Sequence, residues 1–308
     1  KKRKVRKATK RSILVACGLC MSLLGSGFVS TDMAEALSNI PLLEPIYKDF
    51  RDIAADKIEH DQLATLIDKQ DSLNGLTMTV KEAAYDGSRL MVSIAYTGEK
   101  DLSMEEEMVG FNYVTINGKP VKPAIGSTHS RDINSKTIIE HHQFTFSNYD
   151  EYGDEIEIAV HGEDLFGYEG EWTVAFPLKK IAGDISVFHP NVKTELFDDM
   201  YLLTADKVTF SPLSTRIDLT IDYPTEMDEN DTWPYFEFSV VDDTGRVYDK
   251  LKLQAGMAGN YGHHMVLTLP PMDTIPKSFT LKPSLTNSEG FSEEIKELKL
   301  IVPLDKKK

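Results

Sequence analysis

The chain has 308 residues and a formal net charge of −15, from 34 Lys and Arg against 49 Asp and Glu. Residues 1–11 hold eight basic side chains and no acid, which leaves 26 basic against 49 acidic side chains and a charge of −23 for the remainder. That balance excludes a nucleic-acid-binding protein, which needs a basic face. It is typical of an exported protein kept soluble by self-repulsion, or of one that meets cations or basic polymers.

Residues 12–31 carry no charge and follow the basic residues 1–11. As a helix this stretch would be ~30 Å long, about the thickness of the hydrocarbon core of a bilayer. It predicts a single transmembrane helix, with residues 1–11 as its cytoplasmic flank and the rest of the chain outside the cell. A cleaved secretory signal is the alternative, because residues 34–36 read Ala-Glu-Ala, and cleavage after Ala36 would leave a secreted protein.

Residues 32–72 are predicted to be a helical juxtamembrane segment. Within it Leu43, Ile46, Phe50 and Ile53 recur at spacings of three and four residues, the period of one helix face. We interpret this stripe as a candidate partner contact. It would pack on the following domain or on the same helix of a second copy, so a homodimer is one of the expected assemblies.

From residue 74 the hydrophobic period changes to two, which is typical of β-strands. Alternating or apolar segments are found at 76–80, 90–96, 113–116, 156–160 and 172–176. Asp86-Gly87 and Asn117-Gly118 predict tight turns between such segments. Short strands with turns and no helical period predict an immunoglobulin-like β-sandwich over residues 73–180. Its last strand should turn Trp172, Val174 and Phe176 to one inward face.

The pattern then repeats over residues 181–308. Residues 88–94 correspond to 215–221, residues 141–146 to 263–268, and residues 171–178 to 297–304, with offsets between 122 and 127. Three correspondences in the same order predict a second sandwich of like topology. The expected fold is therefore mainly β, with two tandem immunoglobulin-like sandwiches after the transmembrane and juxtamembrane helices.

Few residues form a pattern that could carry chemistry. No nucleophile elbow, phosphate-binding loop or zinc-protease motif is present. The histidine pairs at 141–142 and 263–264 resemble ligands, but strand neighbours point to opposite faces, so one of each pair should pack and the other be solvated. Asp228, Asn230 and Asp231 form the best candidate Ca²⁺ site, although a solvated turn is the preferred interpretation. We therefore expect no enzyme activity, no cofactor and no metal.

Residues 34–41 (AEALSNIP), 46–47 (IY), 74–80 (NGLTMTV) and 85–92 (YDGSRLMV) resemble a family of Gram-positive, single-pass membrane proteins. The ectodomain of that family is a domain of unknown function, often followed by a second immunoglobulin-like module. Members are commonly linked to extracytoplasmic-function sigma factors and described as anti-sigma factor-like. The resemblance implies no catalytic residues, and the sigma-binding part of the family lies outside this chain.

Topology and resemblance together lead to the expectation of a membrane-anchored envelope sensor or regulator. Its ectodomain would bind a ligand or partner, and its single helix would relay the event, with a sigma factor reached through a cytoplasmic part that is not in this sequence. A structural or adhesive surface protein, with tandem sandwiches as spacers, is the alternative. An enzyme with a site assembled from scattered acidic and histidine side chains is a third and less favoured interpretation.

Overall fold

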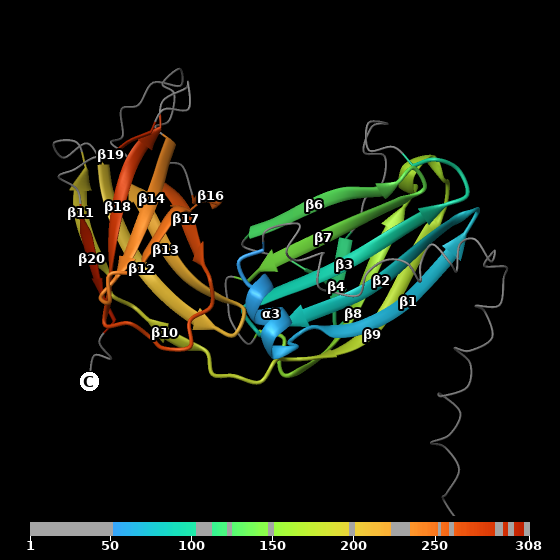
Figure 1. Ribbon diagram of the computed structural model, residues 1–308, viewed down its shortest axis with the longest axis horizontal. Helices are drawn as coiled ribbons and strands as arrows, with labels where there is room; N and C mark the ends of the chain where they lie inside the picture. Colours follow the sequence, from blue (N-terminus) through green and yellow to red (C-terminus); the bar gives the residue numbers. More distant parts are fainter. Residues whose placement is uncertain are drawn as a thin grey trace, which may run out of the picture.

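The computed structural model describes residues 52–102, 113–121, 125–146, 151–196, 201–222, 235–251, 254–258, 262–286, 292–294 and 299–304. The fold is mainly β, with several antiparallel sheets and, among these residues, the single α-helix α3 (Ala55–Asp61). Figure 1 shows two β-rich units side by side, with α3 at the place where they meet. The first unit comprises β1–β9 and the second comprises β10–β20.

The first unit is built from two sheets. One has the order β1 (Thr65–Leu73), β2 (Leu76–Tyr85), β3 (Arg89–Gly98), β7 (Thr137–Thr145) and β6 (Ile125–Asn134). The other has the order β5 (Lys119–Pro120), β4 (Tyr113–Ile116), β8 (Glu155–Glu163) and β9 (Glu171–Lys179). A 3-10 turn, η1 (Leu165–Gly167), lies between β8 and β9.

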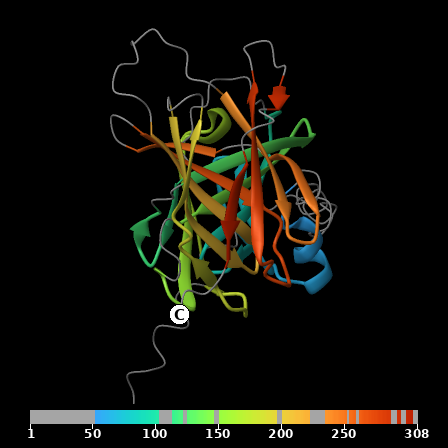
Figure 2. The same ribbon diagram turned by 90° about the vertical axis from the view of Figure 1, so that its left-hand side faces the viewer.

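The second unit repeats this order of strands. One sheet runs β10 (Ser186–Phe188), β12 (Tyr201–Ser211), β13 (Ser214–Asp222), β17 (Gly262–Leu269) and β16 (Gln254–Ala258), with β11 (Val192–Leu196) also paired to β12. The other runs β15 (Val247–Leu251), β14 (Tyr235–Asp242), β18 (Ser278–Thr286) and β19 (Ser292–Glu294), with β20 (Leu300–Pro303) also paired to β18. In Figure 2 this second unit faces the viewer.

Asparagine–glycine pairs close two of the hairpins, of which the one at Asn117-Gly118 confirms a predicted turn. Asn74 and Gly75 have φ angles of 51° and 89° between β1 and β2, and Asn117 and Gly118 have 51° and 74° between β4 and β5. Two consecutive positive φ angles are what a two-residue type I′ turn requires, and its twist matches that of the strands. These turns therefore fix the register of both hairpins.

Each unit encloses its own hydrophobic core. The core of the first unit includes Trp172, Val174 and Phe176, and the indole Nε1 of Trp172 donates a 3.1 Å hydrogen bond to the carbonyl of Leu76. Every second residue of β9 is buried, which confirms the predicted inward face. In the second unit Leu300 and Val302 are buried on β20 in the same alternation.

The prediction of a helical segment over 32–72 is wrong for its last part, because Thr65–Leu73 is strand β1. Only Leu66 and Ile67 supply large apolar side chains before Leu73, and Leu66 remains half exposed. The turn at Asn74-Gly75 and pairing with β2 therefore override the weak helical period. Residues 1–51, including the predicted membrane span, lie outside the described residues. Within the described ranges no helix has the length and apolarity to cross a bilayer.

Candidate functional site

Helix α3 packs where the two units meet. Its Ile58, together with Ala54 and Ala55 at its start, lies in a small cluster that is separate from both main cores. We call this cluster the joint core; its buried members are Ala54, Ala55, Ile58, Ala84, Met91 and Leu213. Ala84 and Met91 come from β2 and β3 of the first unit, whereas Leu213 comes from the β12–β13 turn of the second. The chain that leads into α3 therefore touches both units.

Buried hydrogen bonds hold the turn between β2 and β3 and connect the two units. The Asp86 carboxylate accepts from the backbone N–H groups of Ser88 and Arg89 through Oδ1, at 2.8 and 2.7 Å, and from that of Leu213 through Oδ2, at 2.9 Å. Arg216 donates through Nη1 to the carbonyl of Phe146 at 2.7 Å. Because all these groups are buried, breaking one leaves an unsatisfied polar atom, which costs about 1–3 kcal/mol.

Asp52, just before α3, forms a buried ion pair with Arg89 on β3. The guanidinium donates from Nη2 to Oδ2 at 2.7 Å and from Nη1 to Oδ1 at 3.2 Å, so the pair is bidentate. Arg89 also donates to Gln143 Oε1 at 2.5 Å, and Asp52 Oδ1 accepts from the N–H of Ala54 at 2.7 Å. The side chains of Asp52 and Arg89 are 0% and 5% exposed, so solvent does not screen their attraction.

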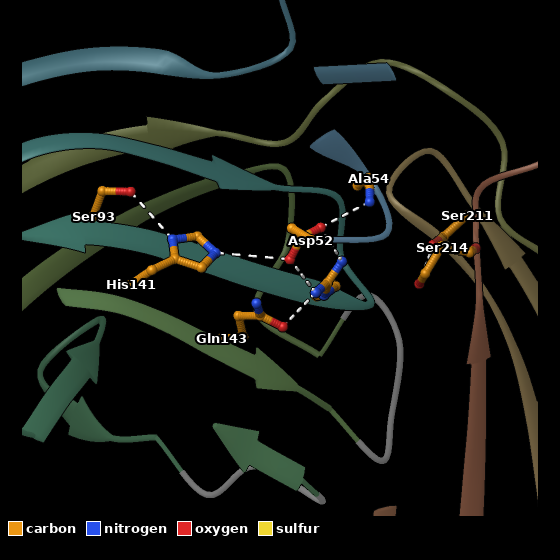
Figure 3. Close-up of polar contacts among 8 residues, drawn as sticks. Asp52, Ala54, Ser93, His141, Gln143, Ser211 and Ser214 are labelled. Atoms are coloured by element: carbon orange, nitrogen blue, oxygen red, sulfur yellow. Dashed lines mark hydrogen bonds and ion pairs between the residues drawn. The ribbon is translucent and has the colours of Figure 1, made fainter. Parts of the chain in front are cut away.

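His141 on β7 extends this arrangement along the sheet. Its Nε2 lies 3.7 Å from Asp52 Oδ2, and its Nδ1 is 3.2 Å from the hydroxyl of Ser93. Ser93 in turn donates to Glu82 Oε1 at 3.3 Å. Figure 3 shows the labelled side chains of Asp52, Ser93, His141 and Gln143 close together beside Ala54, with Ser211 and Ser214 of the second unit further away. We call Asp52, Arg89, His141 and Gln143 the Asp52 cluster.

The charges in the Asp52 cluster determine its protonation. Burial acts to raise the pKa of Asp52, but the Arg89 guanidinium, the His141 ring and the Ala54 N–H outweigh it and hold the pKa well below its usual range. Burial lowers the pKa of His141, and the Asp52 carboxylate only partly offsets that effect. The cluster is therefore a carboxylate–guanidinium pair beside a histidine that stays neutral near neutral pH.

The second unit holds a related group of side chains, the Asp218 cluster. Arg216 donates through Nη2 to Asp218 Oδ1, and His264 Nε2 lies 3.1 Å from the same oxygen. Lys207 Nζ lies 3.8 Å from Asp218 Oδ2. Burial acts to raise the pKa of Asp218, but the His264 hydrogen bond and the charges of Arg216 and Lys207 lower it overall.

Strand register shows that the two clusters are equivalent. His141 pairs with Ser93 across β7 and β3, and His264 pairs with Thr220 across β17 and β13. Ser93 and Thr220 each lie four residues after the arginine of their cluster. His141 therefore corresponds to His264, and the sequence alignment, which matched it to residue 263, is wrong by one position.

The clusters differ in where their carboxylate comes from. Asp218 lies on β13 two residues after Arg216, so the second unit supplies its own acid. The equivalent position, two residues after Arg89, is Met91, which packs in the joint core. The first unit instead takes its carboxylate from Asp52, 37 residues before Arg89 in the chain. The charge balance of the first sheet thus depends on the segment that precedes α3.

The histidine pair 141–142 does not divide into one packed and one solvated side chain, as the sequence suggested. Both are buried, at 0% and 7% exposed. They do point to opposite faces, but His142 has its ring nitrogens 2.8 Å from Glu140 Oε2 and 3.1 Å from Thr128 Oγ1. Within the described ranges no group of three or more histidine, cysteine or acidic residues is arranged to hold a metal.

Of the other predicted site residues, only Ile53 lies in the described part, and it is half-buried. Leu43, Ile46 and Phe50, like the Ca²⁺ candidates Asp228, Asn230 and Asp231, lie outside the described residues. Sequence reasoning missed Asp52 and the role of Arg89. The available signal was the arginine that recurs at 89 and 216 in the aligned repeats.

Comparisons with known proteins match parts of this chain to two family models and find a solved structure of similar fold. A search of curated protein sequences finds no match. One solved structure, the conserved domain protein from Bacillus anthracis, aligns with 86% of this chain and 95% of its own at 15% identity and a TM-score of 0.59, a likeness of fold. A titin A168–A169 structure aligns over 79% of this chain and 97% of its own, at 9% identity and a TM-score of only 0.20.

Two family models match separate parts of the sequence. Residues 185–305 match DUF5643, a family of unknown function, across the second unit. Residues 3–97 match DUF4179, a domain of unknown function, and this match includes the apolar stretch, Asp52 and strands β1 and β2. The chain is thus similar to DUF4179 in its N-terminal third and to DUF5643 in its C-terminal part.

Proposed function

We propose that this chain is a membrane-anchored envelope sensor or regulator, anti-sigma factor-like, whose exported part acts by binding a ligand or partner and not by catalysis. In this proposal residues 12–31 are the anchor, and residues 73–180 and 181–308 are two tandem immunoglobulin-like sandwiches. The match over residues 3–97 supports it, because DUF4179 domains are commonly anti-sigma-factor-like. The order of basic flank, apolar stretch and acidic remainder supports the topology.

The observation that carries the proposal is the position of Asp52. The chain that arrives from the apolar stretch enters the folded part at a buried ion pair with Arg89. The next residues enter the joint core, where Leu213 of the second unit packs against them. A relay needs a contact that connects the ligand-binding part to the membrane-proximal chain, and the joint core together with the Asp52 cluster is such a contact.

A change in the angle between the units would act on this contact directly. Moving the second unit displaces Leu213, which removes apolar packing from α3 and a hydrogen bond from Asp86. Partial displacement of Asp52 is costly, because leaving one charge of a buried pair without its partner costs about 3–5 kcal/mol. In this proposal the segment before α3 is therefore either docked or released. A ligand shifts the balance between them by its difference in affinity for the two.

A structural or adhesive spacer is the second candidate. The observation that favours it is the set of buried hydrogen bonds between the units. Leu213 donates to Asp86 and Arg216 donates to Phe146, and these bonds would resist movement of one unit against the other. A stiff pair of units suits a protein that holds something away from the surface. The two candidates differ in whether a change at the joint has an effect inside the cell.

A reporter for the promoter controlled by the cognate sigma factor distinguishes them. Leu213→Asp places a charge in the joint core and should alter reporter output at equal amounts of membrane-associated protein. The matched control is Ile301→Asp on β20, where the native side chain is 62% exposed and outside the joint, and it should leave the output unchanged. If removal of residues 52–308 leaves the promoter response untouched, the sensor proposal is wrong and the spacer stands.

A further inference from the structure

The sheet that carries Arg89 is buried on both faces. Every residue of β2 and β3 is buried, although only alternate residues can point into the core of the first unit. The inward set includes Met78, Val80 and Ile94. The outward set includes Thr79 and Ala95, and no member of it described below is more than 3% exposed, apart from Gln143. Something must therefore cover the outer face.

The outward side chains form four rows across β2, β3 and β7. From the far end toward the joint, the rows are Thr77–Thr97–Thr137, Thr79–Ala95–Ile139, Glu82–Ser93–His141 and Ala84–Met91–Gln143. We call these rows the outer strip. The two far rows consist of small or β-branched side chains, which leave a shallow surface that another segment can approach closely.

The strip is one element wide. On the same face, Gln70 and Ser72 of the edge strand β1 and His129 and Arg131 of the edge strand β6 are exposed. The covered part of this face is thus confined to the three strands β2, β3 and β7, which are about 10 Å across at the usual spacing between strands. One α-helix with its side chains is about 10–12 Å across. The covering element is therefore a single helix or extended segment that runs along β3.

Buried hydroxyls at the far end also point to an occupant. The Oγ1 atoms of Thr79, Thr97 and Thr137 are buried and have no hydrogen-bond partner within the described part of the chain. Thr97 and Thr137 face each other across β3 and β7, and Thr79 belongs to the next row. Buried polar atoms in folded proteins are nearly always paired, so these hydroxyls are suited to polar groups of the covering segment.

The described helix occupies only the joint end of the strip. Helix α3 packs on Ala84 and Met91 in the last row, and Figure 1 shows it at that end of the sheet. Asp52 reaches the row before it, through Arg89 and His141. Asp52, the first described residue, therefore lies on the strip itself. From the row of Met91 to the row of Thr97 the strip is about 20 Å long, which about 13 helical residues span.

We propose that residues 32–51 dock along the outer strip, with Leu43, Ile46 and Phe50 against β3 and the Asp52–Arg89 ion pair as the latch at its joint end. This inference rests on the proposed function and deepens it, because it names the surface from which the membrane-proximal chain is released. Leu43, Ile46 and Phe50 recur with the helical period, and residues 32–51 number 20, more than the about 13 that the strip requires. Release would expose the threonine rows and leave Arg89 without its carboxylate.

Thiol protection in the full 1–308 chain tests the docking. Cys17 and Cys20 are replaced by serine, and Ala95→Cys places one small thiol in the strip. We expect this thiol to resist alkylation in the otherwise native chain. The pair Ile46→Asp and Phe50→Asp should accelerate alkylation about tenfold or more, equivalent to about 1.4 kcal/mol. The matched control Lys48→Asp, between the stripe positions, should leave the rate unchanged.

A probe on the other face of the sheet reports whether the fold is intact. Ala83→Cys lies in the core of the first unit and should stay protected in every variant. Disulfide formation needs no disruptive change, so it provides the second measurement. Leu43→Cys, Ile46→Cys or Phe50→Cys should crosslink within one chain to Ala95→Cys and not to Arg131→Cys on the exposed edge. Failure of all three to crosslink, or disulfides only between two chains, overturns the proposal.

The outcomes also separate this inference from the proposed function. If Ile46→Asp with Phe50→Asp exposes the Ala95→Cys thiol but leaves the sigma-dependent reporter unchanged, docking is real and the sensor proposal fails. If the thiol is equally protected with and without those charges while removal of residues 52–308 still alters the reporter, the sensor proposal stands and the docking inference is wrong.

Discussion

The substitution Asp52→Asn tests whether the first unit depends on the carboxylate that precedes α3. It keeps the size of the side chain and removes its charge, so the buried Arg89 guanidinium loses its counter-ion. Removing one partner of such a pair costs about 3–5 kcal/mol. Gln143 still accepts from Arg89 at 2.5 Å, so we expect the lower end of that range. The measurement is urea-induced unfolding of the full chain, followed by circular dichroism.

A double-mutant cycle separates the pair from general disruption. Arg89→Met alone leaves Asp52 buried beside His141, whereas Asp52→Asn with Arg89→Met leaves neither charge. The double variant should therefore lose less stability than the sum of the single variants, by about 0.5–3 kcal/mol. As a control, Glu155→Gln breaks the exposed pair with Lys179 and should change stability by less than about 0.5 kcal/mol. A loss below about 1 kcal/mol for Asp52→Asn would show that the carboxylate is solvated and refute the latch.

Three further predictions concern the core, the histidine and the linker. Phe176→Ala should cost about 3–5 kcal/mol of unfolding free energy, as large-to-small core changes do, whereas Ile301→Ala on the surface should cost less than about 0.5 kcal/mol; equal losses would contradict the assigned faces. Because burial lowers the pKa of His141, the unfolded chain binds its proton first on acidification, so stability should fall below about pH 6.5 by up to about 1.4 kcal/mol per unit. His141→Gln should flatten that slope, while His189→Gln at an exposed site should not, as pH-dependent urea titrations would show. A Cβ on Gly183, in the chain between β9 and β10, would lie 2.7 Å from Pro212 Cγ, so Gly183→Ala should loosen this connection and speed limited proteolysis at residues 182–184. Asp184→Ala is its control, and equal cleavage rates in both would count against a tight joint.

The strands and hairpins of the fold could be predicted because their signals are local. Alternation over β9 and the asparagine–glycine turns at 74–75 and 117–118 each specify structure within a few residues. Strand β1 could not be predicted in this way. Its run from Asp68 to Ser72 has no apolar period, and β2 supplies the pairing that makes it a strand. Strand β6, another polar edge strand, was missed for the same physical reason.

The candidate site was only partly visible in the sequence. The sequence repeats aligned Arg89 with Arg216 and matched the two histidine pairs to within one position. Equivalent strands carry these residues in both units, so the repeats could indicate them. Nothing local indicates that Asp52 pairs with Arg89, because 37 residues and two strands separate them. Only the tertiary fold shows that the helical period before β1 ends in a buried carboxylate.

The origin of the carboxylate decides which unit is coupled to the chain that precedes α3. Asp218 is fixed on β13, so it cannot leave Arg216 unless its own sheet unfolds. Asp52 lies on a segment outside the sheet, so its withdrawal would not require β3 and β7 to separate. Withdrawal leaves the buried Arg89 guanidinium with Gln143 as its one remaining side-chain partner among the described contacts, a costly state that returns readily to the docked one. A carboxylate that is strongly favoured in place, yet removable without unfolding, is what the proposed relay between the joint core and a membrane anchor would require.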